Sequence, residues 1–264
     1  MADQVKVGIL GVMGRMGQAV LASVQANEDA IFIAGCDRPR HPDVGQPIAG
    51  TAARLSAKPE QVFDVADVVI DFTPPGDTAS HARLAAQYKK ALVVGTTGLS
   101  GGDESALMIA AGSTRIMQAG NYSQGVNLLM ALVREAASKL GPEWDIDILE
   151  MHHRDKVDAP SGTALMLGDA AAEGRGASLD DLRTPAREGL TGERVEGSIG
   201  FAALRGGSVI GEHDVIFASG SERITLSHKA ENRGLFADGA VRAALWLSAQ
   251  PNGRYNMQHV LDLN

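Results

Sequence analysis

The sequence predicts an α/β protein of two domains, the first built on a parallel sheet and the second on a mixed sheet. The first half alternates short apolar runs, such as VKVGIL at 5–10, with segments of helical periodicity, which is typical of βαβ units. The run VADVVIDFT at 65–73 is almost continuously apolar and suits a strand buried on both faces. After residue 121 the strands alternate in polarity, as in WDIDILEMH at 144–152.

The expected elements follow one another in this order. In the first half we expect strands over 5–10, 30–37, 65–73, 91–95 and 114–118, with helices that end near Val24 and that span 78–89 and 102–112. In the second half we expect a helix over 125–140, strands over 144–152, 198–204, 207–219 and 221–230, an extended loop over 173–194 and a closing helix over 237–250. We therefore predict a discontinuous first domain, residues 1–123 and 234–264, and a second domain, residues 124–233.

Composition and charge narrow the class of protein. The chain has 264 residues, of which 44% are hydrophobic and 21% are charged, so it can bury a core and is not disordered. A net charge of -8 argues against nucleic acid or an anionic membrane as the main partner. Cys36 is the single cysteine, which excludes an internal disulfide and a thiolate zinc cluster. Because no leader pattern and no apolar run of membrane-spanning length is present, we expect a cytoplasmic protein.

The first strand-to-helix junction carries glycines at positions 8, 11, 14 and 17, in GILGVMGRMGQAV. The backbone N–H groups at such a helix start can meet a pyrophosphate, and the helix dipole favours its negative charge. The spacing is G-x-x-G-x-x-G rather than G-x-G-x-x-G, because Met13 holds the middle position. Glycines at strand ends also serve tight turns, so the motif needs support from the next strand.

Asp37 and Arg38 supply that support. They end the second expected strand, about twenty residues beyond the last glycine, where an acid bonds a ribose hydroxyl of a dinucleotide. Arg38 is placed to stack on adenine or to meet a 2′-phosphate, and the alternative is a solvated turn before Pro39. Because Asp favours NADH and Arg permits NADPH, we expect a Rossmann-type domain that binds both.

Two further loops follow later strands, GTTG at 95–98 and AGNYSQG at 119–125. Both carry small and hydroxylic residues, and loops at the carboxyl ends of parallel strands line the ligand crevice of such a sheet. Either loop can be an ordinary turn. As a pair, they are expected to line the nicotinamide side.

The stretch EMHHRDKVDAPSGTA, residues 150–164, gathers an acid, a cation and a helix start. A histidine can donate a proton near neutral pH, and Lys156 adds a positive charge beside it. The run PSGT indicates a helix start, capped by Ser161 or Thr163, whose N–H groups offer a site for a carboxylate-sized anion. The plain alternative is a capped helix with a surface histidine pair. Together, the features fit a small carboxylated substrate that accepts a proton.

Two other chemistries fit this stretch poorly. His152 and His153 are adjacent, so on a strand they point to opposite faces, and no H-E-x-x-H spacing is nearby. Ser161 lies in P-S-G-T rather than in a G-x-S-x-G nucleophile elbow. We therefore expect neither a metal site nor a nucleophilic serine.

The run H-H-R-x-K-x-D-A-P-S-G-T-A, residues 152–164, resembles the signature of the 4-hydroxy-tetrahydrodipicolinate reductase (dihydrodipicolinate reductase) family of bacterial lysine and diaminopimelate synthesis. Motifs along nearly the whole chain are similar to that family: G-x-x-G-R-M-G at 11–17, DFT at 71–73, GTTG at 95–98, N-Y-S-x-G-V-N at 121–127, GEH at 211–213 and ALWL near the C-terminus.

The resemblance implies hydride transfer from NADH or NADPH to a cyclic, unsaturated imine dicarboxylate. His152 would be the acid that protonates the ring carbon, and Lys156 would stabilise or help protonate the developing charge. A homotetramer without a metal is also implied. The residues implied in substrate binding are His153, Ser161, Gly162, Thr163 and Thr97. Those implied in cofactor binding are Gly11, Val12, Met13, Gly14, Arg15, Met16, Asp37, Arg38, Gly95, Thr96, Thr97, Ala119, Gly120, Asn121 and Tyr122.

Two alternative functions are weighed against this one. The first is an NAD-dependent dehydrogenase of another amino dicarboxylate, such as aspartate, which does not need the cluster at 150–164. The second is a regulator that senses NADH without turnover, although the chain has no obvious DNA-binding helix pair. The His152→Ala variant separates the classes, because a reductase loses turnover and keeps NADH binding, whereas a sensor keeps its function.

Overall fold

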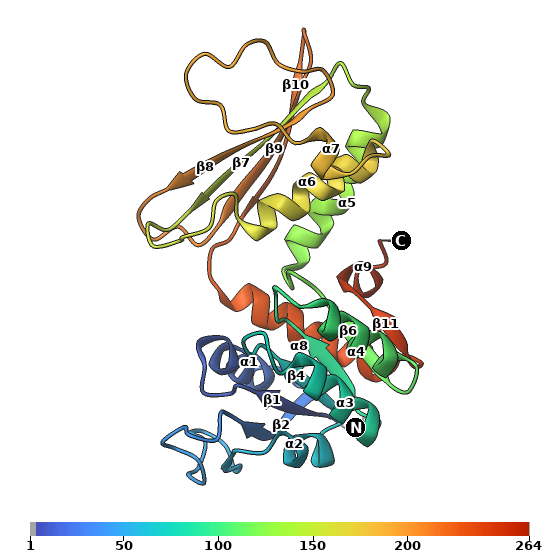
Figure 1. Cartoon of the computed structure of the whole chain (residues 1–264). Coiled ribbons are helices and arrows are strands. Elements are labelled where there is room, and N and C mark those ends of the chain that lie inside the picture. Colours follow the sequence, from blue (N-terminus) through green and yellow to red (C-terminus); the bar gives the residue numbers. More distant parts are fainter. Residues whose placement is uncertain (1–3, 264) are drawn as a thin grey trace. The chain divides into compact units, whose positions relative to one another are not determined.

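The computed structural model describes residues 4–263 and divides the chain into two compact units (Figure 1). The first unit runs to Gln124 and resumes at Gly234, and the second is Gly125–Arg233. The chain therefore leaves the first unit once and returns to it for its closing segment. No helix in the described range is long and apolar enough to cross a membrane.

A seven-stranded parallel sheet forms the centre of the first unit, in the order β11-β6-β5-β4-β1-β2-β3. Its strands are β1 (Val5–Leu10), β2 (Ala30–Cys36), β3 (Leu55–Ser56), β4 (Val68–Asp71), β5 (Ala91–Val94), β6 (Arg115–Gln118) and β11 (Gly253–Tyr255). From β1 the next strands, β2 and β3, add to one side of the sheet, and β4, β5 and β6 then add to the other side of β1. Ligands of open α/β sheets bind at the carboxyl ends of the strands beside such a reversal.

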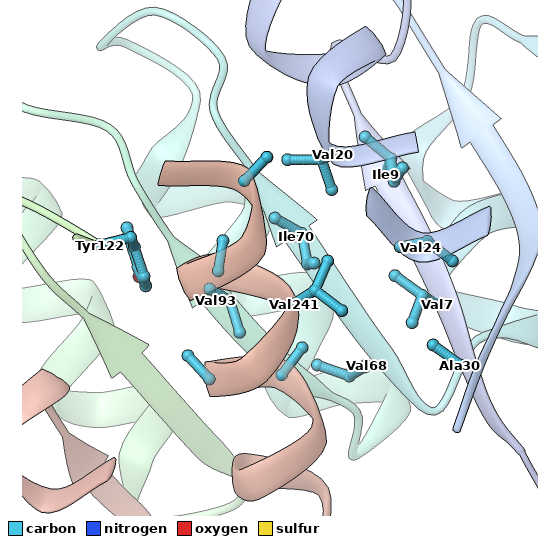
Figure 2. Close-up of a cluster of buried hydrophobic side chains, with 14 of the residues drawn as sticks. Val7, Ile9, Val20, Val24, Ala30, Val68, Ile70, Val93, Tyr122 and Val241 are labelled. Atoms are coloured by element: carbon cyan, nitrogen blue, oxygen red, sulfur yellow. The ribbon is translucent and has the colours of Figure 1, made fainter. Parts of the chain in front are cut away.

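Helices cover both faces of this sheet: α1 (Arg15–Gln25), α2 (Pro59–Val65), α3 (Thr78–Tyr88), α4 (Gly101–Ala111) and α8 (Gly234–Ser248), with the short α9 (Met257–Val260) near the end. One core cluster joins α1 and α8 to the sheet, and Figure 2 shows Val241 of α8 beside Val68 and Ile70 of β4. A second cluster joins α2, α3 and α4 to the opposite face. Cover on both faces explains why β4 and β5 are apolar along most of their length.

The structure corrects the predicted strand over 65–73. Residues up to Val65 belong to α2, which starts with Pro59 and Glu60 in its first turn, and only Val68–Asp71 form the strand. Val65 is the last residue of the helix and Ala66 is its C-cap, so the apolar run came from two elements that meet at a tight connection. Neither α2 nor the short β3, β11 and α9 were predicted.

A four-stranded mixed sheet, in the order β10-β9-β7-β8, forms the second unit together with three helices. The strands are β7 (Asp145–His152), β8 (Ile199–Arg205), β9 (Glu212–Ala218) and β10 (Arg223–Lys229), and the helices are α5 (Gln124–Lys139), α6 (Gly162–Gly174) and α7 (Leu179–Leu182). β7 is parallel to β8 and antiparallel to β9, which confirms the mixed sheet. The predicted loop over 173–194 was wrong in part, because α7 lies in it and is capped by Ser178.

The alternation of β7 positions the polar residues of interest. Ile146 and Ile148 point into the core of the second unit, and two positions further along the same face come Glu150 and His152. Glu150 is 1% exposed and His152 is 8% exposed. A buried carboxylate and a buried imidazole on a core-facing register require hydrogen-bond partners.

Candidate active site

The glycine loop between β1 and α1 has the steric form that its sequence predicts. Gly11 has φ +67°, and a Cβ added to Gly17 would lie 2.1 Å from the Gly11 carbonyl oxygen, so α1 packs against the loop at a distance that only glycine allows. Gly14 is the N-cap of α1 and contributes no side chain, which leaves the helix start accessible to an anion. Val12 is fully buried, so it shapes the loop from within and does not face a ligand.

Asp37 fixes the end of β2 against this loop. Its Oδ2 accepts the backbone N–H of Met13 at 3.1 Å, and its Oδ1 accepts the N–H of Arg38 at 2.8 Å. A cavity of about 680 Å³ opens here, and its walls include Gly11, Met13, Asp37 and Arg38. The cavity, the anion-accepting helix start and the anchored carboxylate fit the pyrophosphate and the ribose of a dinucleotide. Arg15 and Met16 lie in the first turn of α1.

A buried pair that sequence reasoning missed lies behind another wall of the same cavity, which is lined by Thr73 and His81. Asp71, at the end of β4, accepts from the N–H and the hydroxyl of Thr73 at 2.9 and 2.7 Å and lies 2.7 Å from Nδ1 of His81. The hydroxyl of Thr96 donates to the carbonyl of Thr73 at 2.8 Å and ties the next loop to it. The DFT motif at 71–73 contains Asp71 and Thr73, but His81, the partner of Asp71, lies on α3 outside the motif. The pair thus shapes the cavity wall from the core side.

The loops after β5 and β6 are also held by buried contacts. A Cβ on Gly95 would lie 2.1 Å from the ring of Phe72, and Thr97 is exposed at the loop tip. Tyr122 donates its hydroxyl to the Val94 carbonyl at 2.7 Å, and burial raises the pKa of this phenol. The Tyr122 ring therefore packs in the core, and the exposed positions of its loop are the ones left for a ligand. Ala119, Gly120 and Asn121 precede it in that loop.

In the second unit, three groups converge on the Glu150 carboxylate. His152 Nδ1 lies 2.6 Å from its Oε2, the Arg205 guanidinium donates to both oxygens at 2.8 Å, and the N–H of Ser161 donates to Oε1 at 3.1 Å. Burial disfavours the carboxylate, but the hydrogen bonds outweigh it and lower the pKa of Glu150. Burial lowers the pKa of His152, and the Glu150 charge opposes that shift.

His213 on β9 closes the site from the other side. Its ring meets that of His152 edge-on, with the ring centroids 5.1 Å apart, and its Nε2 lies 3.3 Å from the Ser161 hydroxyl. Burial, together with the neighbouring His152 charge, lowers the pKa of His213 to about 4. His213 is therefore neutral near pH 7. Sequence reasoning noted GEH at 211–213 as a family likeness and gave this histidine no role.

The remaining predicted residues lie on the segment that follows β7. Lys156 places its ammonium 2.9 Å from Asp158 Oδ1, which lowers the pKa of Asp158, and His153 is half-buried. Ser161 caps α6 by accepting from the N–H of Ala164, so the first of the two predicted caps is correct. Gly162 and Thr163 form the first turn of α6. Thr97, the other residue predicted to bind substrate, belongs to the first unit.

These two units define a nicotinamide-dependent oxidoreductase, with a Rossmann-type unit for the cofactor and a mixed-sheet unit that carries the buried Glu150–His152 pair. Residues 5–122 match the model of the dihydrodipicolinate reductase N-terminus, and residues 125–261 match that of its C-terminus. The chain therefore belongs to the dihydrodipicolinate reductase family, and its first unit is the NAD(P)-binding domain. The family, the fold class and the cofactor class predicted from the sequence are confirmed.

Relatives and solved structures agree with this assignment. The chain is 46% identical to the 4-hydroxy-tetrahydrodipicolinate reductase of Dinoroseobacter shibae, with 100% of each chain covered. It is 48% identical to that of Caulobacter vibrioides, over 99% of this chain and 98% of the relative. A dipicolinate-bound dihydrodipicolinate reductase from Paenisporosarcina sp. TG-14 superposes with a TM-score of 0.79 at 26% identity, covering 96% of this chain and 97% of that one.

Proposed function

We propose that this chain reduces 4-hydroxy-tetrahydrodipicolinate (dihydrodipicolinate) to tetrahydrodipicolinate in diaminopimelate and lysine biosynthesis, and that His152 supplies the proton. The observation that carries the proposal is the buried His152, bound at Nδ1 by Glu150 and set beside the N-terminus of α6. The names of the full-length relatives support the same reaction. An acid next to an anion-accepting helix start suits a substrate that carries carboxylates and gains a proton.

The first unit holds the cofactor in this proposal. The glycine loop and the start of α1, with the N–H groups of Arg15 and Met16, bind the pyrophosphate, Asp37 accepts from a ribose hydroxyl, and Arg38 accommodates a 2′-phosphate. The loops 95–97 and 119–122 line the remaining part of the dinucleotide. When bound, NADH or NADPH supplies the hydride.

The second unit holds the substrate and completes the reaction. The N–H groups of Gly162 and Thr163, with the Ser161 hydroxyl and His153, bind a carboxylate. His152 protonates the ring carbon, and Lys156 stabilises the charge that develops on the ring. One hydride and one proton added to a double bond of the dehydrated ring give the reduced product, so the atoms and charges balance.

The test is oxidation of NADH and of NADPH, followed by absorbance, with the substrate generated from pyruvate and aspartate semialdehyde by the synthase that precedes this step. Oxidation that depends on the synthase supports the reaction. The His152→Ala variant should bind NADH and fail to oxidise it. Oxidation that is absent in the wild type, or unchanged in the variant, overturns the proposal.

We also propose that the enzyme is a cytoplasmic homotetramer that assembles through the second unit. Leu204 on β8 and Ile224 on β10 are 49% and 40% exposed, so these strands offer apolar surface to another copy. Light scattering after size-exclusion chromatography measures the mass directly. A Leu204→Lys and Ile224→Lys variant should shift it toward smaller species, and a monomeric wild type would contradict the assembly.

A further inference from the structure

Glu150 is the most completely enclosed charge of the second unit's candidate site, and its surroundings come from three separate segments. It is 1% exposed, and its two oxygens accept from His152, from Arg205 and from the N–H of Ser161. The sheet register brings these groups together, because His152 pairs with Arg205 across β7 and β8. A buried carboxylate with every partner in place is rigid, since loss of any one partner leaves a charge uncompensated.

The contact with Glu150 decides which nitrogen of His152 can act. Nδ1 is bound to Oε2 at 2.6 Å, so the imidazole must carry a proton on Nδ1 and the ring cannot rotate without breaking that bond. Nε2 lies at the opposite side of the ring, beside Gly211. A Cβ added to Gly211 would lie 3.0 Å from Nε2, so glycine at this position keeps the approach to that atom clear.

Arg205 joins this anchor to the segment that carries Lys156. Its guanidinium donates to both oxygens of Glu150 at 2.8 Å, and one of the same nitrogens donates to the carbonyl of Asp158 at 2.6 Å. The Asp158 side chain in turn holds the Lys156 ammonium at 2.9 Å. A planar guanidinium with donors in a fixed fork can make these contacts at once, and an ammonium cannot.

We propose that Glu150 and Arg205 are positioning residues of this enzyme. Glu150 holds His152 by Nδ1, so that Nε2 is the atom that gives the proton, and Arg205 fixes Glu150 and the Lys156 segment relative to each other. The proposal rests on the proposed function, because it assigns the orientation of the proton donor in that reaction. It adds two residues that do not touch the substrate and an atom-level assignment for His152.

The pKa of His152 supplies the first test of the role of Glu150. Glu150 is the carboxylate that touches the ring, and its charge favours the protonated imidazole. The other ionisable groups around the ring are cationic or neutral: Arg205 from β8, Lys156 from the following segment, and His213 from β9 with His228 of β10 next to it. Glu150→Gln keeps the shape of the side chain and removes the charge, so the pKa of His152 should fall.

Nuclear magnetic resonance titration of histidine-labelled protein measures this pKa without substrate, with the His152→Asn variant to assign the signal. The matched control is Asp147→Asn, which removes a carboxylate from the same strand where it pairs with Arg187 and Arg194. The pKa of His152 should fall in Glu150→Gln and stay unchanged in the control. Equal pKa values in Glu150→Gln and the wild type would overturn the proposal, whatever the reaction proves to be.

Turnover supplies the second readout. Because His152 must be protonated to donate, the high-pH limb of kcat should move to lower pH in Glu150→Gln, while the Kd of NADH stays at the wild-type value. Arg205→Lys keeps a positive charge but loses the fork, so kcat should fall roughly 10- to 100-fold, again without a change in NADH binding. A merely structural role would lower Tm and leave kcat and its pH profile as they are, which would contradict the assignment.

Discussion

The backbone N–H of Met13 donates to Oδ2 of Asp37 at 3.1 Å, and this bond joins the glycine loop to the end of β2. The carboxylate is thus oriented before any ligand arrives, and it still has lone pairs for a ribose hydroxyl. The position of this carboxylate therefore bears on the choice between NADH and NADPH, which the sequence left open.

Replacement of Asp37 by alanine should weaken NADH binding about tenfold, because one charged hydrogen bond to the ribose is lost. The affinity for NADPH should fall less, because its 2′-phosphate is held by Arg38. Fluorescence titration of both cofactors measures the two Kd values. Asp64→Ala, which removes an exposed carboxylate of α2, is the control and should change neither. Equal losses for NADH and NADPH would speak against the ribose contact.

Gly17→Ala should weaken both the fold and the cofactor site. The new Cβ would meet the Gly11 carbonyl at 2.1 Å, so α1 must move away from the loop, at a cost of about 1–3 kcal/mol. Thermal unfolding and NADH titration measure the two effects. Gly102→Ala is the matched control, because its Cβ would meet only the Ser100 hydroxyl at 3.6 Å and helix propensity favours alanine there. An unchanged Kd in Gly17→Ala would show that the loop tolerates the shift.

Lys156→Ala should reduce kcat by about 100-fold or more while the Kd of NADH stays the same, because the ammonium acts on the substrate rather than on the cofactor. Steady-state kinetics and cofactor titration separate the two quantities. Lys139→Ala, which removes an exposed lysine paired with Glu135 on α5, is the control. Parallel losses of kcat and NADH affinity would mean that Lys156 has another role.

Pyridine-2,6-dicarboxylate, a planar mimic of the ring, should compete with the substrate. Its carboxylate should use the start of α6 and the cations near it, so added salt should weaken its binding. Inhibition kinetics at varied substrate concentration measure both effects. The prediction fails if millimolar concentrations do not inhibit.

Stability should fall as the pH drops from about 6.5 toward 4, in part because of His213. Its folded pKa of about 4 lies below the value of 6.5 for the free side chain, so the unfolded chain binds the proton more readily in this window. The contribution of His213 to the free energy of unfolding is therefore fully present above pH 6.5 and is lost as the pH approaches 4. Urea unfolding across this range should show a shallower pH dependence for His213→Gln than for the wild type. The same slope in both proteins would assign the loss to other groups.

Local patterns in the sequence determined most of the fold. The period of two in β7, the apolar runs of β4 and β5, and the glycines after β1 each reflect a requirement of one element and its immediate neighbours. Where two short elements met, as at α2 and β4, the pattern merged them, because an apolar run carries no period that separates a helix end from a strand start.

The chemistry of single segments was also readable. The stretch 150–164 presented an acid, a cation and a capped helix start, and Ser161 is the cap in the structure. The partners of His152 could not be inferred from the sequence, although Glu150 is the first residue of that stretch. The period of two places Glu150 on the face of Ile146 and Ile148, but nothing local indicates that it binds His152 and Arg205.

The sequence by itself determined the fold class, the cofactor class and the family, because these depend on periodicity and on contiguous motifs. Only the tertiary structure decided which groups meet: Arg205 lies opposite His152 and His213 lies opposite Glu150 in the sheet, although 53 and 63 positions separate the members of these pairs in the chain. The register of a sheet is set by how its faces pack against the core, and that packing involves the whole unit at once.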